Sequence, residues 1–221
     1  MKEFSITHVM KDPTALLKPK DVIEMIEEEP LLRNKLIIRM LYTGGMRVSE
    51  LCGTLIRDVL WDESCIMIPW LKRRRKPGEP PLKRKIPLEV DTFQMIKEWL
   101  DLRRAKKWRL SNPRLIPLNR KRIYHIVRDA AERVYITQVG DPDHPHYPHP
   151  HTLRHSYATQ RVAMSRGNYG VLKKIQYDMG HKNIEMTVSY LRTDPKELHE
   201  DFDEVWEGLF KVEATPSVAK S

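Results

Sequence analysis

The chain has 221 residues, 40% of them hydrophobic, which is enough for one globular domain with its own core. Lys and Arg number 39 against 30 Asp and Glu, and the formal net charge of +9 favours a polyanionic partner, with nucleic acid as the first candidate. No apolar run is long enough for a membrane span, residues 1–20 lack the apolar centre of a secretory signal, and two cysteines are too few for a disulfide framework or a four-cysteine zinc site. We therefore expect a soluble protein of the cytoplasm.

The N-terminal part of the chain predicts helices. Residues 21–29 and 31–43 carry apolar side chains at helical spacing, and Gly44 and Gly45 end the second segment. Residues 49–51 can begin a further short helix.

Two short apolar runs follow, residues 65–70 and 85–88, bounded by proline, glycine or charged residues. They predict a hairpin or a small antiparallel sheet. Pro69 and Pro87 lack the amide proton that a central strand needs, so we expect these strands at a sheet edge. The connection between them, residues 72–85, is rich in Lys and Arg and is expected to project as a basic loop.

The rest of the chain is predicted to be mainly helical. Four prolines within residues 139–150 exclude a helix there, so this segment is expected to be a loop. On either side of it, apolar residues recur at helical spacing over 92–102, 120–134, 151–166, 169–179, 184–190 and 195–210. The fold class expected from these elements is α+β, mainly α-helical with a small antiparallel β-sheet.

Positive charge is concentrated in the middle of the chain. Residues 72–128 hold 19 Lys and Arg against 5 Asp and Glu, an excess larger than that of the whole chain. Residues 191–221 reverse this balance, with 4 Lys and Arg against 8 Asp and Glu. A single charge run is often only a solvated face, but an excess of this size favours contact with phosphates.

Five residues form the sharpest candidate site. His151 and Arg154 are three apart in a predicted helix, so they can reach one oxyanion together near a helix N-terminus. Arg47 follows a Gly-Gly-Met turn, where a guanidinium can be fixed against a phosphate by two hydrogen bonds. His181 and, nine residues later, Tyr190 complete the set. Two arginines, two histidines and a tyrosine suit a phosphodiester.

Three motifs in this order resemble the tyrosine recombinases, also called the phage integrase family. The similar segments are residues 43–51 (TGGMRVSEL), residues 151–159 (HTLRHSYAT) and residues 179–183 (MGHKN) with Tyr190. The resemblance runs from about residue 19 to about residue 210 and implies the catalytic-domain fold of that family. Nine Asn and Gln in the chain, with 31% charged residues, favour a thermophilic source, an archaeon or an archaeal virus.

The resemblance implies a role for each matching residue. Tyr190 would attack the scissile phosphate of double-stranded DNA and form a 3′-phosphotyrosyl link. Arg47 and Arg154 would hold the non-bridging oxygens, while His151 would act near the tyrosine proton and His181 on the phosphate. The protein–DNA ester retains the bond energy, so no metal, ATP or other cofactor is expected.

A hairpin lysine should protonate the leaving 5′-oxygen. Lys72 fits best by its distance from Arg47, and Lys83 is the alternative, although the loop departs from the family's usual Gly-Lys-Gly pattern. Contacts with DNA phosphates are expected from nine basic residues: Arg73, Arg74, Arg75, Lys76, Lys83, Arg84, Arg120, Lys121 and Arg122.

Other interpretations remain open for several residues. Glu50 is expected to position Arg47, and His155 to lie in the core or behind the site. An isolated tyrosine such as Tyr190 is usually a packing residue, and only its context favours catalysis. A zinc or nickel site is a weaker alternative for the cluster of His144, His146, His149 and His151.

The expected organisation is a linker or remnant at residues 1–18, a catalytic domain at 19–193, and an acidic helix with a flexible tail at 194–221. Residues 1–18 are too short for the family's N-terminal core-binding domain, so we expect either a catalytic fragment or a minimal one-domain enzyme. The expected activity is integration, excision or dimer resolution on nucleoid or viral DNA, by a dimer or tetramer. The C-terminal helix is expected either to bind a neighbouring subunit or to pack on its own domain. A type IB topoisomerase-like relaxing enzyme and a non-catalytic DNA-binding regulator are the alternatives.

Overall fold

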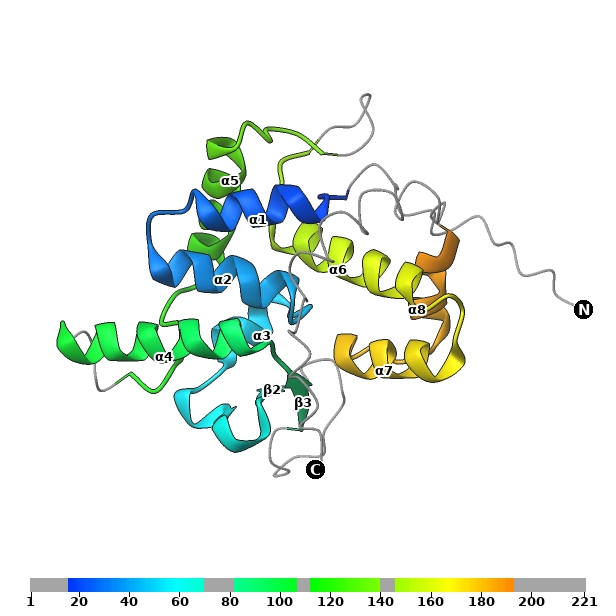
Figure 1. The fold of residues 1–221 in the computed structure, drawn as a ribbon, viewed down its shortest axis with the longest axis horizontal. Helices are drawn as coiled ribbons and strands as arrows, with labels where there is room; N and C mark the ends of the chain where they lie inside the picture. Colours follow the sequence, from blue (N-terminus) through cyan, green and yellow to red (C-terminus); the bar gives the residue numbers. More distant parts are fainter. Residues whose placement is uncertain (1–15, 70–81, 107–111, 140–145, 193–221) are drawn as a thin grey trace, which may run out of the picture.

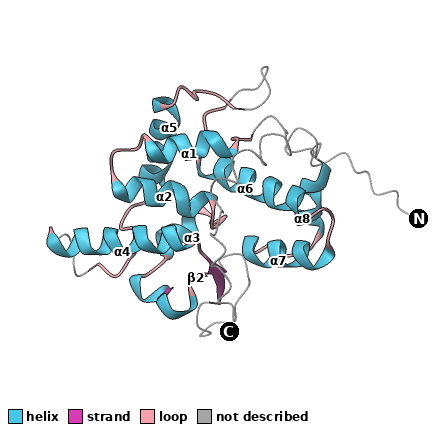
Figure 2. Cartoon of the chain, in the orientation of Figure 1, coloured by secondary structure: helices cyan, strands magenta, loops and turns pink. Residues whose placement is uncertain are grey.

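Helices make up most of the residues that the computed structural model describes, which are 16–69, 82–106, 112–139 and 146–192 (Figures 1 and 2). The helices are α1 (Pro19–Glu27), α2 (Leu32–Tyr42), α3 (Val48–Gly53), α4 (Val90–Ala105), α5 (Arg120–Arg133), α6 (Pro150–Met164), α7 (Tyr169–Met179) and α8 (Glu185–Val188). Short 3-10 helices are η1 (Ile56–Asp58), η2 (Trp61–Glu63) and η3 (Ser189–Arg192). The expected mainly helical α+β class is confirmed.

The predicted helices agree with the structure to within a few residues, with two differences of note. α1 begins at Pro19, two residues earlier than expected, because proline is well tolerated in the first turn of a helix. The helix expected over 184–190 is divided into α8 and η3. The helix expected over 195–210 lies outside the described residues, as do residues 140–145 of the expected loop.

The sheet has three antiparallel strands in the order β1 (Val59–Leu60), β2 (Cys65–Pro69) and β3 (Lys83–Pro87). The predicted hairpin is confirmed, but β2 is the central strand, so its expected edge position is wrong. Pro69 is accommodated because it ends β2, beyond the two residues that pair with β1. A strand of two residues is too short to leave a period in the sequence, so β1 was not expected.

The hydrophobic core surrounds α2. Its side chains Leu36, Ile37, Ile38, Met40 and Leu41 are all fully buried, because α1, α4 and α6 pack against it (Figure 1). Burial of these and the other apolar core side chains stabilises the fold. α6 and β3 in turn contact α7, which brings the C-terminal end of the described chain against the core.

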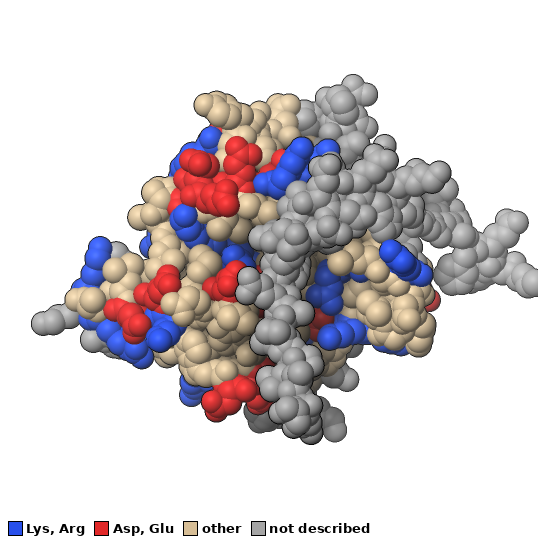
Figure 3. All heavy atoms as spheres, viewed as in Figure 1, with Lys and Arg blue, Asp and Glu red and all other residues tan. Residues whose placement is uncertain are grey.

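Charged side chains of both signs alternate over the described residues on the face shown in Figure 3, with Asp and Glu gathered near α1. Within the described ranges, no helix is both long enough and apolar enough to cross a bilayer.

Candidate active site

Arg154 lies at the meeting point of three segments. Its side chain is only 3% exposed, and its guanidinium donates to the carbonyl oxygen of Gly45 and, at 2.5 Å, to that of Met179. These carbonyls belong to the turn before α3 and to the last residue of α7. Burial and then the charge of Arg47 lower the pKa of Arg154, which nevertheless stays protonated at neutral pH because guanidinium is so strong a base.

Arg47 is fixed by Glu50 at the start of α3. The Arg47 backbone N–H donates to Glu50 Oε2 at 2.8 Å, and its guanidinium donates to Oε1 at 2.9 Å. The expected positioning of Arg47 by Glu50 is thus confirmed. Glu50 is fully buried, and burial alone would raise its pKa, but the hydrogen bonds and charge of Arg84, with those of Arg47, hold it below the ordinary value. Glu50 is therefore a carboxylate at neutral pH.

This group of side chains carries an excess of positive charge. Arg47, Arg84 and Arg154 interact electrostatically with the single carboxylate of Glu50. The next carboxyl group in the neighbourhood, that of Asp178, lies 3.9 Å from the guanidinium of Arg161, which offsets its charge. Two positive charges in this group are left uncompensated, which suits an oxyanion.

Tyr190 lies next to two histidines. Its ring is 4% exposed and stacks parallel to the His181 ring, with centroids 6.1 Å apart. The His155 ring lies at 5.2 Å on a tilted plane, and Tyr190 also interacts electrostatically with Arg154. The structure therefore brings Tyr190, His181, Arg154 and, through Arg154, Arg47 into one site.

Backbone geometry directs His181 toward this site. Gly180 ends α7 with a φ of 59°, a left-handed conformation that glycine adopts without strain. The chain turns there, and His181 Nδ1 then lies 3.0 Å from the hydroxyl oxygen of Thr187. Sequence reasoning missed this contact of Thr187, and it expected His155 in the core or behind the site without naming its contact with Tyr190. The position of His155 next to Arg154 in the same helix was the available signal.

His151 is exposed in the first turn of α6, whereas Arg154 on the same helix is buried. Its ring lies edge-on to that of His149, with centroids 6.2 Å apart. The joint contact of His151 and Arg154 with one phosphate oxygen stays a prediction.

Residues of the basic loop divide into three groups. Lys72, Arg73, Arg74, Arg75 and Lys76 lie outside the described residues. Lys83 pairs with the buried carboxylate of Asp58, a contact that competes with a role as the catalytic lysine. Arg84 is fully buried, so its expected contact with a DNA phosphate is wrong: a guanidinium with no exposed surface cannot reach the duplex.

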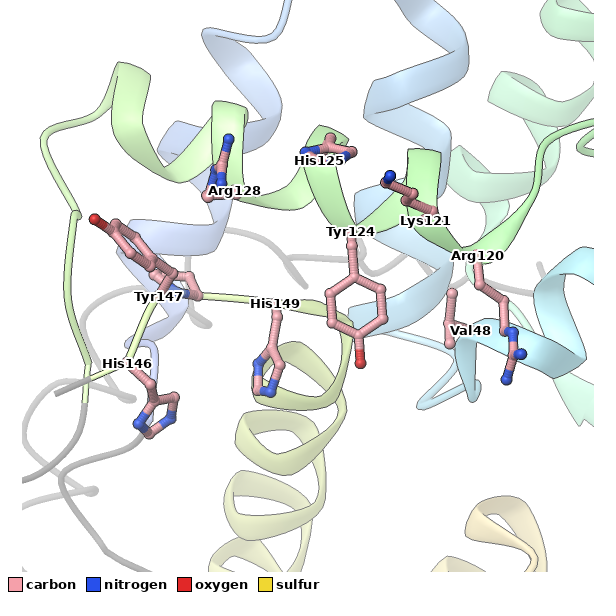
Figure 4. Close-up of a pocket in the computed structure, with 10 residues that line it drawn as sticks. Val48, Arg120, Lys121, Tyr124, His125, Arg128, His146, Tyr147 and His149 are labelled. Carbon is pink, nitrogen blue, oxygen red and sulfur yellow. The ribbon is translucent and has the colours of Figure 1, made fainter. Parts of the chain in front are cut away.

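An open groove of about 770 Å³ lies between α5 and the chain leading into α6. Figure 4 shows Arg120, Tyr124 and His149 pointing into the same space. Lys121 also lines the groove, and Arg122 is exposed in the same turn of α5. A basic and aromatic lining of this kind suits nucleic acid.

One histidine at this groove, His149, caps the N-terminus of α6. The amide N–H of Thr152 donates to His149 Nδ1 at 3.3 Å, which makes His149 the N-cap of the helix that carries Arg154. Burial and the charge of His146 lower the pKa of His149, favouring the neutral ring that this cap needs. His144 lies outside the described residues, and the described ranges contain no group of three His, Cys, Asp or Glu arranged to hold a metal ion.

Comparison with known proteins adds the family. The model of the phage integrase family matches residues 16–197. The chain is 28% identical over 176 residues to a tyrosine recombinase of Thermosipho africanus, covering 80% of this chain and 55% of that protein. It is also 28% identical over 192 residues to tyrosine recombinase XerA of Pyrococcus horikoshii, covering 83% and 59%. The chain thus spans about half the length of the curated relatives it matches.

Solved structures share the fold. The crystal structure of XerA recombinase superposes with a TM-score of 0.65 at 24% identity, covering 86% of this chain and 64% of that one. A post-cleavage complex of XerH site-specific recombinase with its palindromic difH substrate gives a TM-score of 0.63 at 22% identity, covering 89% and 54%. Since the family model matches most of the chain, this protein belongs to the phage integrase family, the tyrosine recombinases.

Proposed function

We propose that residues 19–193 form the catalytic domain of a site-specific DNA recombinase, which cleaves and rejoins strands through a 3′-phosphotyrosyl intermediate. The observation that carries the proposal is the gathering of Tyr190, His181 and Arg154 beside Arg47, in a group with uncompensated positive charge. The names of the relatives, tyrosine recombinases and site-specific recombinases, support the same reaction.

In the proposed reaction, the Tyr190 hydroxyl oxygen attacks the phosphorus while the bond from phosphorus to the 5′-oxygen breaks. The tyrosine proton passes to His151, and Lys72 donates a proton to the leaving 5′-oxygen. Arg47 and Arg154 stabilise the negative charge that accumulates on the non-bridging oxygens, and His181 donates to one of them. Rejoining reverses these steps with the 5′-hydroxyl of another strand. No step draws on a cofactor.

DNA contacts are proposed along the groove at α5. Arg120, Lys121 and Arg122 are exposed in its first turn, where Asn119 caps the helix by accepting from the Arg122 amide at 2.8 Å. Their charges would bind phosphates and make the affinity fall with salt. Arg73, Arg74, Arg75, Lys76 and Lys83 are proposed to add phosphate contacts from the hairpin side.

Self-association on DNA, as a dimer or tetramer that uses residues 194–221, completes the proposal. The protein would then work where DNA is, at the nucleoid or on viral DNA.

A selection for covalent adducts tests the reaction without a known target site. The protein is incubated in chelator with a pool of nicked duplexes whose central 30 or so base pairs are randomised, and adducts are isolated after denaturation and sequenced. We expect protein attached to DNA 3′ ends at one enriched sequence, and none with Tyr190→Phe, which should still bind DNA. Cleaved DNA that carries no protein, and that forms only when magnesium replaces the chelator, would contradict the proposal. Adducts without sequence preference would favour a topoisomerase-like enzyme. Binding to one sequence without adducts would favour a regulator.

A further inference from the structure

Among the described residues, Arg84 is the largest side chain that is fully buried. It lies in β3 between two exposed or half-exposed lysines, and its neighbour across the sheet is Ile68 of β2. A buried guanidinium is costly unless every charge and donor finds a partner. Its partners therefore show what holds it there.

The first partner is Glu50. Arg84 Nη1 and Nη2 donate to Glu50 Oε1 and Oε2, both at 3.0 Å, so that the two side chains form a planar two-point pair with 0% exposure on each side. Oε1 and Oε2 also accept the two hydrogen bonds from Arg47. Arg84 thus fixes the orientation of the same carboxylate that fixes Arg47.

The second partner lies at the C-terminal end of α7. Arg84 Nε donates to the carbonyl oxygen of Asp178 at 3.1 Å, and Arg154 donates to the carbonyl oxygen of the next residue, Met179. Carbonyls in the last turn of a helix lack helical partners and attract positive charge. Two buried guanidiniums therefore hold adjacent carbonyls just before the turn that leads to His181.

We propose that Arg84 is a positioning residue for the phosphate site. By holding and neutralising Glu50, it leaves the remaining donors and the charge of Arg47 available to the scissile phosphate. Without Arg84, the Glu50 carboxylate would draw Arg47 toward itself and repel the phosphate. The proposal rests on the proposed function, because it concerns the same phosphate, but it is tested below first with a phosphate analogue and no DNA.

The first test measures binding of orthovanadate by calorimetry. We expect Arg84→Met to weaken binding about tenfold or more, as Arg47→Met does, because Glu50 then draws Arg47 away from its charge-assisted interaction with the anion. Arg84→Lys, which keeps the charge but cannot form the two-point pair, should give an intermediate loss. The matched control is Lys85→Met, which removes the same charge from the next residue of β3, where the side chain is half exposed and pairs with Glu63. It should stay within about twofold of wild type.

Folding is controlled with a second variant. If Arg84→Met does not fold, the double variant Glu50→Gln/Arg84→Met removes both buried charges together and keeps one acceptor oxygen for Arg47. It should fold and recover most of the affinity for vanadate. The proposal would be overturned if Arg84→Met binds vanadate as tightly as wild type, or if Arg84→Lys does so where Arg84→Met does not fold. It would also be overturned if the wild-type protein does not bind vanadate.

The second test uses the duplex obtained by the adduct selection. A neutral methylphosphonate at the scissile position removes the charge that Arg47 must stabilise, so the defect of Arg84→Met in the rate of adduct formation should shrink at least tenfold, as for Arg47→Met. An equal defect on both substrates would mean that Arg84 only maintains the fold. If a sulfur leaving group at the 5′ position reduced the rate defect of Arg84→Met and the methylphosphonate did not, Arg84 would act through the hairpin lysine. If wild type forms no adduct with any duplex, the proposed function fails, and the vanadate result still decides the role of Arg84.

Discussion

Protonation of His149 should weaken the start of α6, the helix that carries Arg154. The Thr152 amide donates to His149 Nδ1, and a ring protonated there keeps a donor for the Thr152 hydroxyl but has no lone pair for the amide. Burial, then His146, lowers the pKa of His149 below its usual 6.5 in the folded protein. Between these two values the unfolded chain binds more protons, so stability is complete above about pH 7 and falls as pH drops toward the folded-state pKa.

The size of this loss follows from the cap. An N-cap hydrogen bond contributes about 1 kcal/mol to helix stability, and one proton changes the unfolding free energy by at most about 1.4 kcal/mol per pH unit. The comparison variant is His149→Asn, because asparagine is a strong N-cap that does not titrate. We expect wild type and variant to have similar stability at pH 8, and wild type to be about 1 kcal/mol less stable at pH 5.

Urea unfolding, followed by tryptophan fluorescence at half-unit intervals from pH 5 to 8, measures this difference. Subtracting the two curves removes the contributions of the other histidines. His149→Leu serves as the control, since it lacks the cap at every pH and should be less stable than His149→Asn by a constant amount. A difference between wild type and His149→Asn that stays flat, or a relative gain of wild-type stability in acid, would refute the reasoning.

Three further outcomes are expected. Gly45→Ala should unfold at least about 2 kcal/mol more easily in urea, because a Cβ there would lie 2.6 Å from the Tyr157 ring at a φ of +54°; unchanged stability would contradict this. Glu50→Gln should cost about 3–5 kcal/mol in the same assay, since it leaves the buried charge of Arg84 without its counter-ion, whereas a loss under 1 kcal/mol would mean that the pair is dispensable. Replacing residues 120–122 with glutamine should weaken binding to any duplex and reduce the slope of log affinity against log salt by up to about 3. A slope equal to that of wild type, measured by fluorescence anisotropy, would place these charges away from the DNA.

Helical periodicity located the helices well because one face of each must meet the core. α2 illustrates this: apolar spacing over residues 31–43 predicts the helix, and Leu36, Ile37, Met40 and Leu41 are buried while Leu32 is partly buried. The ends of α1 and the division between α8 and η3 could not be predicted to the residue, because they depend on local caps rather than on the apolar pattern. β2 is central because β1 pairs with it, and a strand of two residues is too short to be predicted from sequence.

The site was predictable where a motif fixes both residue type and spacing. Arg47, Arg154, His181 and Tyr190 were all named from the sequence, although the distances between them come from packing of α6 and α7 against the core. The buried position of Arg84 was missed because a Lys-Arg-Lys run was interpreted as a surface. The alternation of a strand was the available signal: Arg84 and Ile86 face inward, two residues apart, while Lys85 between them faces solvent.

The charges of the site also suggest why the fold gathers three guanidiniums, the buried Arg84 and Arg154 and the partly exposed Arg47, around one carboxylate. A phosphodiester in the ground state carries one negative charge, whereas the pentacoordinate state formed with a tyrosine that has lost its proton carries two. Two uncompensated positive charges among Arg47, Arg84 and Arg154 therefore match the second state better than the first. Only an interaction that strengthens toward the transition state accelerates the reaction. Neutralisation of Glu50 by Arg84 would then affect the rate more than the DNA affinity, because it leaves two positive charges in the site and only the transition state carries two negative charges.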